Sequence, residues 1–299
     1  FRYYKGLHKN VITDLFGGQY YVDSYNRKTV LAENSQNGGV ASWVNQKLGV
    51  GDVIRRDYDG FVMYEGGFAQ LEYNKDKVSA FVSGGLTNTS YWRKDRFYYS
   101  GDKQVSSKKH YLGGNLKAGL NYNLDEYNNV FFNTGFISRA PIFDNTFINS
   151  QSSHERNPDA KNEKVYSFEL GYGYRSHYFT ANVNAYYTMW KDKALYDTGS
   201  YEDANGASQR WTMSGAQANH MGIELDFIAK PFRWMEVNGM FSWGDWRWNG
   251  TAKGFMMNTE GQIMANSRGE IATDMNNVDQ YKYTIKMDNV QVGGSAQTT

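Results

Sequence analysis

Two stretches of the sequence combine aromatic and basic side chains at a density that suits ligand recognition. They are "SYWRKDRFYYSG" at 90–101 and "WGDWRWNG" at 243–250. Aromatic rings stack on sugars or other flat ligands, and guanidinium groups hold anionic groups through paired hydrogen bonds. The candidate ligand-binding residues are Tyr91, Trp92, Arg93, Arg96, Tyr98, Arg139, Trp246 and Arg247. The alternative, in which these residues pack loops or lie at a membrane interface, stays open.

Other site chemistries have little support in the sequence. It contains no cysteine, and the spacing of its five histidines (His8, His110, His154, His177 and His220) matches no metal site. A Gly-x-Ser-x-Gly elbow and a phosphate-binding loop are also missing, so we expect no catalytic residue, cofactor or metal. A hydrolase that uses a serine with His110 or His220 on the wall of a barrel is kept as the alternative function.

The composition favours strands and turns. The 299 residues include 31 Gly and only 3 Pro, and 16% of them are aromatic. A formal net charge of +1 produces no field that would attract a polyanion, so we expect no nucleic-acid partner.

Apolar and polar residues alternate along several segments, as in a strand with one apolar face. In 178–189 the apolar series is Phe179, Ala181, Val183, Ala185, Tyr187 and Met189. Similar segments occur in pairs and predict four hairpins, with a ninth strand near 281–293. Short turns are predicted near 74–77, 123–128, 175–178 and 230–233. Long polar loops are predicted at 91–107, 139–163, 191–218 and 247–280.

The regular alternation of short and long connections is typical of membrane barrels, which have short periplasmic turns and long extracellular loops. A sheet survives in hydrocarbon only when it closes, because every backbone polar group must be paired. About nine strands with a free edge at each end do not close into a barrel by themselves at the tilt and width of such a barrel. We therefore predict an all-β fold, part of an antiparallel transmembrane β-barrel whose apolar face contacts outer-membrane lipid. A soluble carbohydrate-binding β-sandwich is a third interpretation.

The chain divides by pattern into two parts. Residues 1–57 are interpreted as an extracellular loop region that contains a strand end and a short helix near 11–16, and residues 58–299 as barrel strands and loops.

The segment from Gly135 to Tyr172 resembles the barrel of TonB-dependent outer-membrane receptors. "GFISRAPIFDNTF" carries the family's Arg-Ala-Pro at the top of one strand, and "NPDAKNEKVYSFELGY" resembles the Asn-Pro and Glu-Leu-Gly at the start of the next. Ala160 and Asn162 replace the usual Leu and second Pro. "AYYTMWKDK" and "ANHMGIELDFIAKP" are similar to later strands, and the opening residues resemble the branch with a carboxypeptidase-regulatory-like domain.

The resemblance implies that these are about nine to ten strands of a 22-stranded barrel in the outer membrane. It further implies import of a scarce nutrient, such as a siderophore, a cobalamin-like compound or a glycan. The implied partners are the TonB-ExbB-ExbD complex, acting through a plug domain expected outside these residues, the small nutrient ligand and outer-membrane lipid. Assistance by a surface lipoprotein is left open.

Overall fold

The structure is a computed structural model, and it describes all residues except 18–19, 22–46, 203–207, 259–261, 267 and 293–299. Ten strands form one sheet in the order β1-β4-β5-β6-β7-β8-β9-β10-β11-β12. Their bounds are β1 Arg2–Val11, β4 Val53–Lys75, β5 Val78–Asp95, β6 Lys109–Asn123, β7 Asn128–Arg139, β8 Glu163–Arg175, β9 Phe179–Glu202, β10 Ser208–Phe232, β11 Met235–Met257 and β12 Tyr283–Gln291. Two short strands, β2 (Tyr20–Tyr21) and β3 (Lys47–Leu48), pair separately.

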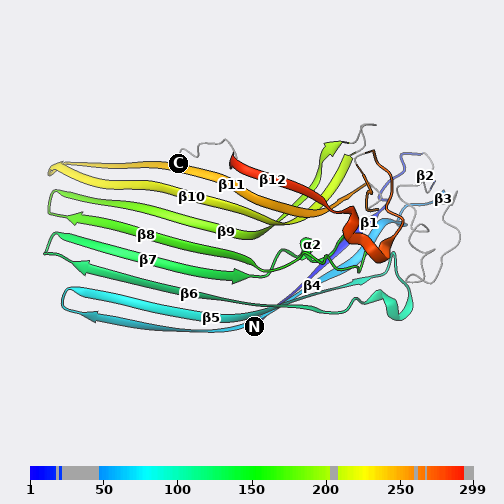
Figure 1. Cartoon of the computed structure of the whole chain (residues 1–299), viewed down its shortest axis with the longest axis horizontal. Coiled ribbons are helices and arrows are strands. Elements are labelled where there is room, and N and C mark those ends of the chain that lie inside the picture. Colours follow the sequence, from blue (N-terminus) through cyan, green and yellow to red (C-terminus); the bar gives the residue numbers. More distant parts are fainter. Residues whose placement is uncertain (18–19, 22–46, 203–207, 259–261, 267, 293–299) are drawn as a thin grey trace.

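Every neighbouring pair in the large sheet is antiparallel. The predicted all-β antiparallel fold and the predicted nine to ten barrel strands are therefore confirmed. Figure 1 shows the strands running side by side along the long axis, with tight turns at one end and the longer connections gathered at the other. These are called the hairpin end and the loop end below.

The turns at the hairpin end are short, as predicted. Only Asp76 and Lys77 separate β4 from β5, and the left-handed φ of 52° at Asp76 suits an Asp in a tight turn. Between β6 and β7 the Asp125 carboxylate accepts hydrogen bonds from the backbone N–H groups of Tyr127 and Asn128 at 2.8 and 2.9 Å. The last turn, Arg233–Trp234, lies two residues later than the sequence indicated.

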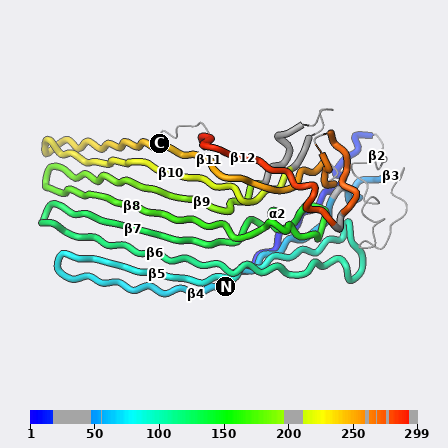
Figure 2. Tube along the Cα trace, viewed as in Figure 1, coloured from blue at the N-terminus to red at the C-terminus, as the bar shows by residue number. Residues whose placement is uncertain are grey.

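One of the predicted long loops is largely strand, and a second begins as strand. The predicted loop at 191–218 continues the β9–β10 ladder, with pairs such as Trp211 and Asp197. The alternation is lost there because the β9–β10 register shifts between Gln209 and Arg210 and twice between Met213 and Ala218. β11 likewise extends to Met257, well inside the predicted loop at 247–280. The trace in Figure 2 shows these strands continuing beyond the ends of β7 and β8.

The N-terminal region differs from its interpretation as a loop with a short helix. Residues 2–11 form a full strand that pairs with β4, for example Lys5 with Phe61. Residues 12–15 are neither helix nor strand, and Phe16 lies in a turn. The helix expected near 11–16 is therefore wrong. Most of 18–46 lies outside the described residues.

The sheet has one apolar and one polar face. Mutually paired residues on one face form an apolar row across seven strands: Ala80, Leu120, Phe132, Leu170, Ala185, Ile223 and Trp243. The adjacent row on the other face is Ser79, Asn121, Phe131, Gly171, Asn184, Glu224 and Ser242. Large side chains of the first row are open, with Leu170 61% exposed. Such exposure across a whole face indicates a surface made for an apolar environment.

The β-sandwich interpretation fails on the same rows. It requires a second sheet over the apolar face, but the described residues form one ten-stranded sheet and the two-stranded β2–β3 pair. Among the described helices, none combines the length and the apolarity that crossing a bilayer requires.

The buried hydrophobic side chains gather toward the loop end. One cluster joins Ile148 from the connection after β7 to Phe255, Met257 and Ile263. A second contains Met213, Ala216 and Ala252, and a third joins Ile12 to Leu48. The loop end therefore has its own small hydrophobic cores.

Candidate functional site

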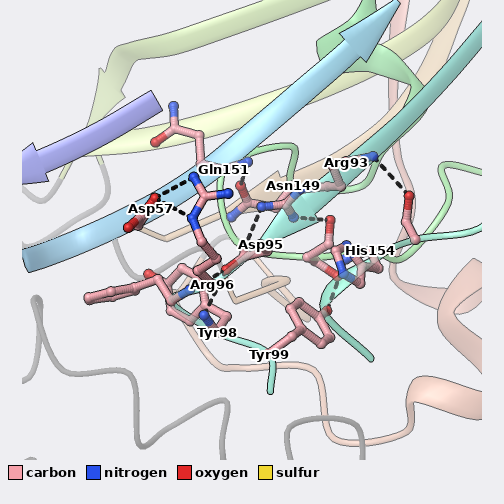
Figure 3. A network of polar contacts seen from close by, with 12 residues as sticks. Asp57, Arg93, Asp95, Arg96, Tyr98, Tyr99, Asn149, Gln151 and His154 are labelled. Carbon is pink, nitrogen blue, oxygen red and sulfur yellow. Dashed lines mark hydrogen bonds and ion pairs between the residues drawn. The ribbon is translucent and has the colours of Figure 1, made fainter. Parts of the chain in front are cut away.

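Arg93, near the end of β5, is the centre of a buried polar network at the loop end (Figure 3). Its side chain has no exposed surface. One terminal nitrogen donates to Asp95 Oδ2 at 2.5 Å, and the other donates to the backbone carbonyl of Ser153 at 2.5 Å. The guanidinium also lies over the Tyr58 ring, 4.5 Å from its centroid. Arg93 therefore ties β5 to the connection between β7 and β8.

The residues after Arg93 form a tight loop around Asp95. Its Oδ1 accepts hydrogen bonds from the backbone N–H groups of Phe97 and Tyr98, both at 2.8 Å. Arg96 turns the other way and forms ion pairs with Asp57 at 2.6 Å and Asp59 at 2.9 Å, both on β4. The Arg93 fork is buried and its two terminal nitrogens bind protein acceptors, and the Arg96 fork is occupied by two carboxylates, so neither guanidinium is offered to a ligand.

His154 connects the β7–β8 connection to the loop that follows β5. Its ring stacks on Tyr99 with centroids 3.9 Å apart, and its backbone N–H donates to the Tyr99 hydroxyl at 2.9 Å. Nε2 lies 3.1 Å from the carbonyl oxygens of Lys103 and Gln104, so it must carry the proton. Burial and the nearby Arg93 charge lower the pKa of His154 to about 4.

The connection from β7 to β8 spans the loop end. It contains the one-turn helix α2 (Phe143–Thr146), whose Asn145 donates to the Met213 carbonyl on β10 at 3.2 Å. On the opposite side, the Tyr91 hydroxyl donates to the Pro141 carbonyl at 2.9 Å. The segment thus bridges β5 and β10 through buried contacts.

Below this bridge, the polar face carries a group of aromatic side chains on β9–β11, which we call the aromatic wall: Tyr186, Trp190, His220 and Trp246. His220 and Trp246 are direct partners across β10 and β11, and their rings stack with centroids 5.7 Å apart. Trp246 Nε1 donates to the Tyr186 hydroxyl at 3.0 Å. The wall presents ring faces and polar edges together, which suits a flat or glycosidic ligand.

A basic edge borders the aromatic wall. The Arg139 guanidinium lies over the Trp190 ring at 5.2 Å, and Lys193 Nζ lies over the same ring at 4.7 Å. Arg139 also forms an ion pair with Glu163 at 2.8 Å, but its side chain remains 53% exposed. This edge can therefore still contact an anionic group.

The structure does not bring all eight sequence-derived candidates together. Tyr91 and Arg93 lie on the polar face and are buried, and Arg96 and Tyr98 belong to the loop between β5 and β6. Arg139 and Trp246 border or belong to the aromatic wall. Trp92 and Arg247 lie on the apolar face. Each is an even number of residues along its strand from a member of the apolar row, Ala80 on β5 and Trp243 on β11. A single ligand cannot touch residues on both faces of one sheet.

Sequence reasoning missed that Trp190 and His220 belong with Trp246. The signal that finds them is strand parity, since Trp190 lies an odd number of residues from Val183 and therefore opposite the apolar series. The His154–Tyr99 stack had no such signal, because the two residues meet between separate loops.

The hydrolase alternative has one geometric counterpart. Ser90 Oγ and His110 Nδ1 are 2.8 Å apart on the apolar face. Ser90 has no exposed surface, so a substrate carbonyl cannot reach its hydroxyl. The described residues contain no group of three or more His, Cys, Asp or Glu side chains that could hold a metal.

Comparison with known proteins identifies the architecture. The family model described as "TonB dependent receptor-like, beta-barrel" matches residues 2–291. A solved structure, "Copper transporter OprC", is similar with a TM-score of 0.47 and 14% identity over 80% of this chain. The chain spans only 38% of that transporter's length. No curated protein matches the sequence. With the family match spanning nearly all of the sheet, the chain belongs to the TonB-dependent receptor-like β-barrel family.

Proposed function

We propose that this chain forms part of the wall of an outer-membrane receptor that imports a scarce nutrient with energy supplied through TonB, ExbB and ExbD. The observation that carries the proposal is the exposed apolar face on a single-layer antiparallel sheet, opposite a face of Asn, Glu and Gly. Family membership supports it, because TonB-dependent receptors are outer-membrane transporters.

The dimensions of the apolar face fit a bilayer. On β9 the apolar series runs from Phe179 to Met189, and Lys191 follows on the same face. Those 11 residues match the 9 to 11 that a tilted spanning strand requires. In this orientation the loop end lies outside the cell and the hairpin end faces the periplasm.

The aromatic wall is our candidate for this chain's contribution to ligand contact. It lies on the polar face, which would line the barrel interior, and Arg139 and Lys193 add cationic groups beside it. Tyr91 and Arg93 would act indirectly by holding the bridging connection in place, and Arg96 and Tyr98 by ordering the loop that follows β5. A siderophore, a cobalamin-like compound and a glycan all offer the rings or anionic groups that such a wall recognises.

Uptake by cells tests the function. A strain that lacks the gene would be complemented with the full-length protein and supplied with radiolabelled ferric siderophore, cobalamin or an oligosaccharide. We expect accumulation of one of these probes, and we expect the accumulation to require functional TonB. Uptake of none of them in any complemented strain would contradict the proposal.

Two tryptophans on opposite faces of β11 give a matched pair for the ligand wall. Trp246→Ala removes the partner of His220 and should lower uptake about tenfold, the scale of losing a stacking contact worth 1–1.5 kcal/mol. Trp243→Ala removes an equal ring from the apolar face and should leave uptake unchanged. The hydrolase alternative predicts turnover of p-nitrophenyl esters, lost in Ser90→Ala, and we expect no such turnover.

A further inference from the structure

Three aromatic rings near the loop end of the apolar face each have a lysine ammonium group above them. Lys108 Nζ lies 4.4 Å from the centroid of the Trp92 ring. Lys5 Nζ lies 5.9 Å from Phe61, and Lys191 Nζ lies 5.6 Å from Tyr166. The same arrangement therefore occurs at two places in the sheet, once across β1–β5 and once across β8–β9.

The first of these places is a compact platform. Lys5, Phe61 and Trp92 are direct partners in one row of the sheet. The Phe61 and Trp92 rings stack with centroids 5.0 Å apart and planes 4° apart, and Tyr3 lies 6.1 Å from Trp92. Two ammonium groups thus flank a flat aromatic surface, which continues directly into the apolar face.

The charges of this platform are only partly neutralised within the protein. Lys5 forms an ion pair with Asp59 at 3.2 Å, and its side chain stays 52% exposed. Within the described part of the chain, no carboxylate lies within 4.0 Å of the Nζ of Lys108 or Lys191. Lys108 is exposed to solvent on the connection before β6. These two ammonium groups can therefore bind an external anion.

We propose that this lysine–aromatic rim, made of Lys5, Phe61, Trp92, Lys108, Tyr166 and Lys191, binds the phosphate groups of a phosphorylated glycolipid in the outer leaflet. The inference rests on the proposed membrane location. Ammonium groups supply donors to phosphate oxygens, and aromatic rings suit the boundary between headgroup and acyl chains. The apolar face below the rim accommodates the acyl chains, so the rim matches a lipid better than a free anion.

A binding titration tests this with the full-length protein in detergent. The probes are bis-phosphorylated lipid A, the same lipid after removal of both phosphates, and inorganic phosphate. We expect the bis-phosphorylated lipid to bind more tightly than either of the others, with an affinity that falls as salt rises. Equal binding of the two lipids would overturn the proposal, and binding of inorganic phosphate as tight as that of lipid A would reassign the rim to a simple anion site.

Variants localise the effect. The double variant Lys108→Gln/Lys191→Gln should lower lipid A affinity by about fivefold for each lysine. Arg at both positions should restore most of the affinity, because the charge returns. The control Lys75→Gln/Lys117→Gln removes two charges from the hairpin end and the polar face and should bind normally. A control that loses as much affinity as the rim variant would show that net charge alone is responsible.

Detergent dependence and nutrient uptake of the same proteins keep the two proposals distinguishable. If the rim variant needs detergent and restores uptake but the protein shows no preference for phosphorylated lipid, the rim inference alone fails. If the protein stays monodisperse without detergent, the membrane location itself is wrong.

Discussion

The hairpin end and the loop end of the sheet differ in the interactions that stabilise them. At the hairpin end one layer of strands has apolar side chains such as Leu71 and Leu170 more than half exposed. At the loop end Phe147 and Phe255 have no exposed surface; Phe255 packs with Ile148 and Met257, and the Arg93 guanidinium lies over the Phe147 ring. The apolar side chains of the hairpin end depend on the surroundings to shield them from water, whereas those of the loop end are buried by other residues of the chain.

The difference shows why the two ends suit different tasks. Strands that face hydrocarbon need only alternation and a complete ladder of backbone hydrogen bonds, because lipid chains adapt to an apolar surface of any shape. Loops in water need a specific set of contacts to remain ordered. The loop end therefore concentrates the buried charges, and the effect of a substitution should depend strongly on the end at which it is made.

The largest effect is expected at Arg93. Arg93→Met removes the guanidinium that pairs with the buried Asp95 carboxylate and donates to the Ser153 carbonyl. Breaking a buried pair in this way costs about 3–5 kcal/mol. Hydrogen exchange of the amides at 97–106 should show a corresponding fall in the opening free energy of this loop.

A matched control for Arg93 lies at the hairpin end. The Lys230–Glu236 pair, at 3.2 Å, has side chains 55% and 48% exposed. Lys230→Met should change stability far less than Arg93→Met does, because solvent screens a surface pair. Similar effects of the two substitutions would show that the loop end is not held by its buried network.

The next largest effect tests the covering of the apolar face. Val183→Arg places a charge where lipid is expected and should cost about 2–4 kcal/mol if the residue lies near the bilayer midplane. Asn184→Arg adds the same charge to the polar face and should be tolerated. Folding of both variants into lipid vesicles, followed by denaturant titration, measures the difference, and equal costs would remove the assignment of the faces.

Sequence periodicity was sufficient for the hairpin end because the pattern there has a single cause. An apolar environment on one face and a polar one on the other force alternation, and alternation predicted the strands through Val183 and the turns near Asp76 and Asp125. The prediction from alternation failed in strands that have no continuous apolar face. β9 and β10 continue beyond the apolar series with shifted register, and β1 carries Tyr, Lys and His in a strand whose apolar alternation is weak.

The candidate site was predictable only in part for the same reason. The residue types were right, since aromatic and arginine side chains do gather at the loop end. Their distant partners were not predictable, because Arg93 meets the Ser153 carbonyl through a fold-back of 60 residues along the chain. Whether a side chain such as Trp92 serves the interior or the lipid side depends on parity, which the sequence does contain.

A smaller effect is expected from glycines that admit a neighbouring ring on the polar face. An added Cβ at Gly171 would overlap the Phe131 ring, which covers it from the paired strand. Gly171→Ala should therefore cost about 1–3 kcal/mol through overpacking. Gly67→Ala is the control, because no atom lies within 4 Å of its added Cβ. Denaturant midpoints in lipid compare the two, and an equal response would argue against tight packing on the polar face.

The smallest effect is a pH dependence confined to the loop end. The pKa of His154 falls from an ordinary 6.5 to about 4, chiefly because burial disfavours the imidazolium and Arg93 repels it. The opened loop therefore binds a proton more readily than the closed one between these values. The stabilisation is complete above about pH 6.5 and decreases as the pH falls toward 4.

Because the His154 ring is partly open to solvent, we expect this loss to be about 1–2 kcal/mol. Hydrogen exchange at 99–106, corrected for intrinsic rates, should report an opening free energy that is lower at pH 5 than at pH 7.5. His154→Gln keeps a donor for the carbonyls of Lys103 and Gln104 but cannot titrate, so its opening free energy should not vary over this range. A slope that persists in the glutamine variant would assign the pH dependence to another group and leave His154 as a neutral packing residue.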